Sequence, residues 1–91
     1  MEMIEALQNS NFKVLNVTLN AGETMPLHKA TSDAYVMNRQ GKGKLTIDDK
    51  EIILNQGDSF LIPANQEHKL EIMEDFKASV IMFPEAKIDF V

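Results

Sequence analysis

Short apolar runs separated by turn-forming residues fill the chain from Phe12 onward, and this spacing constrains the fold more than any other feature of the sequence. Within several runs apolar and polar residues alternate, which indicates strands with one buried face. Asn, Asp, Gly and Pro, the residues that favour turns, stand between the runs. Many short strands at regular spacing are typical of a sandwich or barrel. The predicted strands cover residues 12–19, 23–28, 34–40, 43–47, 50–54, 58–62, 68–73 and 76–83.

A tight hairpin is predicted at Asp48 and Asp49, which separate two of these runs. Pairing outward from this turn places Leu45 opposite Ile52 on a face that we expect to point into the fold. The run 76–83 is apolar on both of its faces. One face therefore fills the interior, and the other needs a cover from the C-terminal tail or from a second subunit.

Composition narrows the classes of function. The chain has 91 residues and a net charge of −5, which indicates one acidic domain over residues 1–91 without electrostatic support for nucleic-acid binding. It has no cysteine, so disulfides and thiolate metal sites are excluded. No run approaches the roughly 20 apolar residues of a membrane span. Residues 1–8 contain two glutamates and predict a turn or two of helix rather than a signal peptide. We therefore expect a cytoplasmic protein.

Two stretches of the sequence carry a histidine in a recognisable setting. The first, GETMPLHKATSDAYVMNRQG, contains His28, and the second, GDSFLIPANQEHKLEI, contains His68. In these stretches, and in their separation, the chain resembles the cupin family. The resemblance implies an all-β double-stranded β-helix, or jelly-roll barrel, as a single domain. Its barrel core would span about residues 12–84, and the tail 85–91 would add a strand at a dimer contact.

The resemblance also implies a metal site, and here the sequence departs from the family pattern. Cupin metals are held by two histidines and a glutamate from the first stretch and by one histidine from the second. This chain keeps His28 and His68 but has Ala30 and Ala34 at the other two positions. Alanine has no donor atom for a metal. The resemblance therefore implies either no cofactor or a divalent metal weakly held by His28 and His68.

Alternation along the strands predicts which side chains surround this site. His68 lies on the apolar face of its strand, which is the inner one. Asn38 shares an inner face with Ala34 and Val36, and its amide oxygen is a candidate third metal ligand. Asp33 points to the opposite face unless a β-bulge rotates it inward. The predicted ligand pocket consists of His28, Ala30, Ala34, Val36, Asn38, His68 and Leu70.

These features leave three functions open, because one fold supports many functions. The favoured one is a non-catalytic module that binds a small polar or carboxylate-bearing molecule in a metal-poor or metal-free pocket. The second is a metal-dependent enzyme of oxygenase or isomerase type that uses His28 and His68. The third is a structural homodimer whose interior has no activity. We expect a homodimer, and we expect neither nucleic acid nor a membrane as a partner.

Overall fold

Eight antiparallel strands make up the computed structural model, which describes residues 1–91. The strands are β1 (Glu2–Gln8), β2 (Lys13–Leu19), β3 (Thr24–Ala30), β4 (Ala34–Ile47), β5 (Lys50–Leu54), β6 (Ser59–Ile62), β7 (His68–Met82) and β8 (Ile88–Phe90). The predicted all-β class is confirmed. The structure has no helix of the length and hydropathy that a membrane-spanning segment needs.

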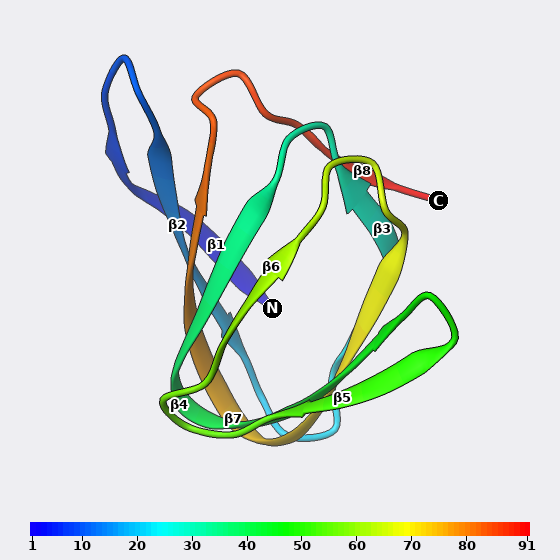
Figure 1. The fold of residues 1–91 in the computed structure, drawn as a ribbon. Helices are drawn as coiled ribbons and strands as arrows, with labels where there is room; N and C mark the ends of the chain where they lie inside the picture. Colours follow the sequence, from blue (N-terminus) through cyan, green and yellow to red (C-terminus); the bar gives the residue numbers. More distant parts are fainter.

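The strands form a single sheet that folds back on itself into two layers (Figure 1). Layer 1 has the strand order β1-β2-β7-β4-β6, and layer 2 has the order β8-β3-β7-β4-β5. Strands β4 and β7 belong to both layers because each runs through one layer, bends at the bottom of the view in Figure 1 and continues in the other. These two strands pair with each other on both sides of the bend.

The bend of β4 is held by Asn38 and Gly41. Asn38 is buried, and its Nδ2 donates hydrogen bonds to the carbonyl oxygens of Gly41 at 2.9 Å and Leu54 at 3.1 Å. Its Oδ1 accepts a hydrogen bond from the backbone N–H of Gln40 at 3.1 Å. Gly41 has a φ of 85°, and a Cβ at this residue would lie 1.9 Å from the carbonyl oxygen of Asp75 on β7. Only glycine allows β4 and β7 to approach this closely in this conformation.

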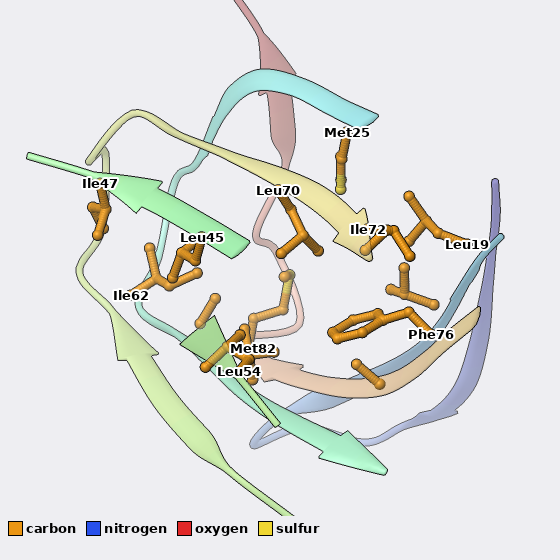
Figure 2. Packing of buried hydrophobic residues seen from close by; sticks show 14 of the residues in the cluster. Leu19, Met25, Leu45, Ile47, Leu54, Ile62, Leu70, Ile72, Phe76 and Met82 are labelled. Carbon is orange, nitrogen blue, oxygen red and sulfur yellow. The ribbon is translucent and has the colours of Figure 1, made fainter. Parts of the chain in front are cut away.

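Apolar side chains from both layers fill the space between them (Figure 2). Phe76, Leu19 and Leu45 are the largest fully buried side chains. The Phe76 ring lies inside the bend, 3.3 Å from the position that a Cβ on Gly43 would take. Because Gly43 has no side chain, the ring can pack directly against the backbone of β4.

The predicted hairpin at Asp48 and Asp49 is confirmed. Leu45 pairs with Ile52, as the sequence predicts, and Ile47 pairs with Lys50. Both turn residues have positive φ, 53° for Asp48 and 61° for Asp49. Two consecutive positive φ values give the turn the twist that a two-residue hairpin requires.

Two predictions about the elements are wrong. Residues Glu2–Gln8 form β1 rather than a turn of helix, and β1 pairs with β2. Met, Glu, Ala and Leu favour helices intrinsically, but the edge of β2 offers backbone partners that override this preference. The runs 34–40 and 43–47, predicted as separate strands, are the single strand β4. The runs 68–73 and 76–83 likewise belong to the single strand β7, which ends at Met82. Irregular pairing at the bend curves these strands without ending them.

Substitution Asn38→Ala is expected to lower the free energy of unfolding by about 2–4 kcal/mol, because it leaves buried backbone groups at the bend without partners. Chemical denaturation in urea measures this change. Arg39→Ala is the matched control, since Arg39 is the next residue along β4 and is exposed, and we expect less than about 0.5 kcal/mol there. Equal effects at the two positions would contradict the role assigned to Asn38.

Candidate functional site

Two buried histidines lie side by side on adjacent strands of layer 2. His28 on β3 is directly opposite His68 on β7 in the strand register, and each is 5% exposed. Directly opposite residues in antiparallel strands point to the same face of the sheet. The two rings therefore meet on the inner face, with their centroids 4.1 Å apart and their planes at 62°.

The backbone determines the tautomer of each ring. Nδ1 of His28 lies 2.6 Å from the carbonyl oxygen of Pro26, and Nδ1 of His68 lies 2.9 Å from that of Gln66. A carbonyl oxygen only accepts hydrogen bonds, so Nδ1 must carry the proton and donate in both cases. In the neutral rings, Nε2 is then an acceptor with a free lone pair.

Strand β3 is irregular where it supplies one of these carbonyls. Its pairing with β7 shifts register between Met25 and His28. Pro26 lies inside this irregularity, where its lack of an N–H costs no ladder hydrogen bond. Gln66 lies in the loop that precedes β7. The two histidines are thus held in the same manner, each by the carbonyl of the second residue before it.

Burial lowers the pKa of both histidines. Loss of solvent is the main cause, and the hydrogen bonds to Pro26 and Gln66 oppose it by favouring the protonated rings. For His28, the neighbouring His68 lowers the pKa further, because two positive charges at this distance repel. Both imidazoles are therefore neutral at pH 7.

The histidines form part of the wall of a cavity between the two layers. The cavity has a volume of about 60 Å³, and 16 of its 18 lining residues are hydrophobic. His28 and His68 are the other two. From layer 1 the wall receives Met3, Leu15, Val17, Ala34, Val36, Ile62, Phe76, Ala78, Val80 and Met82. From layer 2 it also receives Met25, Ala30, Leu45, Leu54, Leu70 and Ile88.

Of the seven residues predicted for the pocket, six line this cavity: His28, Ala30, Ala34, Val36, His68 and Leu70. Asn38 does not line the cavity, because its side-chain amide forms hydrogen bonds with the backbone of Gln40, Gly41 and Leu54. Asp33 is exposed, and its Oδ1 accepts a hydrogen bond from the backbone N–H of Ala64 at 2.9 Å. No bulge rotates it inward, so Asp33 and Asn38 do not join the histidines.

Residues near the C-terminus reach the site, although the predicted pocket does not include them. Strand β8 pairs with β3 of its own chain, with Phe90 opposite His28 and Ile88 opposite Ala30. The ring of Phe90 lies 5.5 Å from that of His28. The alternation of apolar and polar residues in this tail indicates a strand, but it does not indicate which edge the strand joins.

The donor set does not fit a tightly held metal ion. Three protein ligands are usual at a catalytic zinc, and the chain has no group of three or more His, Cys, Asp or Glu side chains that could hold a metal. Ala30 and Ala34 line the cavity at the two positions where the family pattern has ligands. The two Nε2 atoms would be the sole protein donors, which suits at most weak binding.

The two histidines are expected to make stability depend on pH. The pKa values of both histidines in the folded protein lie below the ordinary value of about 6.5. As the pH falls below 6.5, the histidines therefore become protonated in the unfolded chain before they do so in the folded chain. The free energy of unfolding should fall between pH 7 and pH 5 by up to about 1.4 kcal/mol per pH unit for each ring. Urea denaturation at each pH measures this slope, and a double variant with His28→Leu and His68→Leu should lose it. An unchanged slope in that variant would contradict the assignment.

Comparisons with known proteins agree on the family. Curated protein sequences give no match, but the Cupin domain family model matches residues 15–84. A cupin 2 conserved barrel domain protein from Leptotrichia buccalis is 31% identical with a TM-score of 0.81, over 90% of this chain and 40% of that one. A cupin superfamily protein from Desulfitobacterium hafniense is 21% identical with a TM-score of 0.83, over 92% of this chain and 77% of that one.

A third solved structure is that of an enzyme, a DMSP lyase from Ruegeria pomeroyi. It is 17% identical with a TM-score of 0.84, over 91% of this chain and 44% of that one. At this identity the likeness shows a common fold and says nothing about a common reaction. The match to the family model, which spans most of the chain and both histidine stretches, shows more: the chain belongs to the cupin family, and the double-stranded β-helix predicted from the resemblance is confirmed.

Proposed function

We propose that this protein is a non-catalytic module that binds a small, largely apolar molecule in the cavity between its two layers. The observation that carries the proposal is the composition of the cavity wall, in which two histidines are the sole polar residues among 18. Small-molecule sites are typically concave and apolar with a few polar groups that orient the ligand. The apolar wall favours an uncharged ligand over the polar or carboxylate-bearing one predicted from the sequence, because burial of an unpaired charge is costly.

The enzyme alternative has less support from the same residues. A metal-dependent reaction would need a firmly held ion, and the two imidazoles are the sole donors at the site. In a metal-free reaction a neutral histidine could act as general base, but the cavity wall contains no carboxyl, lysine, tyrosine or serine side chain to serve as a nucleophile or as a further acid–base group.

Filling the cavity is expected to abolish binding. Ala34→Leu adds three carbon atoms to a buried wall residue, enough to occupy most of a cavity of about 60 Å³. Native protein should show shifts in the methyl NMR resonances of cavity residues when titrated with ethyl methyl ether or propan-1-ol, and the variant should show none. Ala64→Leu is the matched control, since Ala64 is exposed in a loop, and it should bind like the native protein. Binding that survives Ala34→Leu would place the ligand elsewhere and sink the proposal.

The homodimer predicted from the sequence has a candidate interface on the outer surface of layer 1. One residue from each of the five strands lines up there in register, and all five are apolar or aromatic. This outer row consists of Leu7, Val14, Ile81, Tyr35 and Leu61. It extends over four strand spacings, about 19 Å.

A second copy of this chain is the partner that we propose for the outer row. The C-terminal tail, which could have covered it, is paired with β3 in the other layer. Leu7, Tyr35 and Leu61 are 50%, 40% and 52% exposed, and nearby Ile4 and Phe83 are 53% and 62% exposed. Five half-exposed large side chains leave on the order of 500 Å² of apolar surface, which lies toward the upper end of the roughly 300–600 Å² that the largest apolar patch on a monomer covers, and such a patch often marks an interaction site. Two such faces would pack as sheet on sheet.

Substitution Leu61→Lys is expected to convert a dimer to a monomer, because it places a charge at the β6 end of the apolar contact. Sedimentation velocity over a range of protein concentrations measures the change. Leu27→Lys is the matched control, since Leu27 is similarly exposed but lies on β3, and it should leave the dimer intact. A native protein that is monomeric at high micromolar concentration would refute the proposed interface.

A further inference from the structure

We infer that the ligand of the cavity is an uncharged molecule of about two to four non-hydrogen atoms that carries a hydroxyl or N–H group and donates a hydrogen bond to His28 or His68. This inference rests on the proposed function and specifies the chemistry that the site would recognise. Its basis is the direction in which the two imidazoles can form hydrogen bonds.

Each histidine has already used its donor. Nδ1–H of His28 is bound to the carbonyl oxygen of Pro26, and Nδ1–H of His68 is bound to that of Gln66. Neither Nε2 has a hydrogen-bond partner in the chain. Thr46 Oγ1 is the sole fully buried side-chain polar atom without a partner, so both Nε2 atoms keep some accessible surface. Both side chains line the cavity. The polar side-chain atoms that the site offers to a ligand are therefore two acceptors.

Acceptors require donors from the ligand. The other 16 side chains of the wall are hydrophobic, so no side chain can satisfy an ether, a ketone or a carboxylate oxygen. Such an oxygen would face the Nε2 lone pairs or hydrocarbon, and a buried polar group without a partner costs about 1–3 kcal/mol. A carboxylate would add the larger cost of an unpaired buried charge. A hydroxyl or N–H instead forms the hydrogen bond that Nε2 lacks.

The size of the ligand follows from the size of the cavity. At about 60 Å³ it has less than half the volume of the apolar cavity of about 150 Å³ that accommodates the six carbon atoms of benzene in an engineered protein, so it has room for about two to four non-hydrogen atoms. Three methionines, Met3, Met25 and Met82, belong to the wall, and their flexible side chains can adapt to ligands of slightly different shape. A short aliphatic alcohol is a suitable probe.

Two isomers isolate the role of the donor. Propan-1-ol and ethyl methyl ether have the same atoms and nearly the same volume, but the alcohol alone can donate a hydrogen bond. Binding constants come from NMR titrations that follow the methyl resonances of cavity residues at pH 7.5, with acetate as a charged probe of similar size. In ¹⁵N-labelled protein, the histidine side-chain resonances show which ring nitrogen responds.

We expect propan-1-ol to bind about tenfold more tightly than the ether, the equivalent of one hydrogen bond to an otherwise unsatisfied acceptor. Acetate should not bind measurably. The Nε2 resonance of at least one histidine should move on addition of the alcohol, while the Nδ1 resonances stay in place. In the double variant with His28→Leu and His68→Leu, the preference for the alcohol should disappear. If that variant does not fold, the isomer comparison and the Nε2 response in the native protein decide the question.

Two results would overturn the inference in distinguishable ways. Equal binding of the isomers, or tighter binding of acetate, would leave an apolar binding cavity but refute the donor requirement. Binding of none of the three probes, with methyl resonances that do not respond, would refute the proposed function as well.

Discussion

A single antiparallel sheet can enclose a core only if it folds across itself, and in this protein that fold depends on the bend of β4 against β7. Asn38 ties the bend to Gly41, Gln40 and Leu54 by its side-chain amide, and Gly41 lets the two backbones approach without a Cβ in between. Because β4 and β7 bend together, the first half of β4 lies in one layer and the second half lies in the other, facing it. This geometry places layer 1 over the histidines of layer 2 and creates the cavity.

The site illustrates how a few small residues change what a shared fold can do. With alanine at two positions of the family's metal pattern, His28 and His68 are left as a pair among hydrocarbon side chains. Their Nδ1 protons are held by the backbone, so the rings present lone pairs rather than donors. Such a pair suits a neutral ligand with a hydroxyl or N–H better than a resident metal ion or an anion. Membership of the cupin family therefore establishes the fold and leaves the chemistry to these local features.

The sequence predicted the residues of the cavity wall more accurately than the contacts around them. Alternation along the strands assigned six of the cavity residues to inner faces, because the side-chain period of a strand is a local property. The same rule placed Asn38 inside, where it lies, but could not show that the backbone bend uses its amide. Phe90 was missed for a related reason: a three-residue strand can join any free edge, and only the assembled sheet shows that the edge is β3 beside His28.

By itself, the sequence determined the strand alternation, the hairpin at Asp48–Asp49 and the two histidine stretches. It also determined that alanines, which cannot bind a metal, stand at the other two positions of the family's metal pattern. The tertiary structure alone decided that β4 and β7 run unbroken through their bends, that the N-terminal segment is a strand, and that the two rings meet with both Nδ1 atoms bound to carbonyls. The physical reason is the range of the interactions. Face and turn preferences depend on neighbouring residues, whereas pairing partners and ring contacts depend on backbone groups that lie far apart in the chain and meet only when the sheet closes.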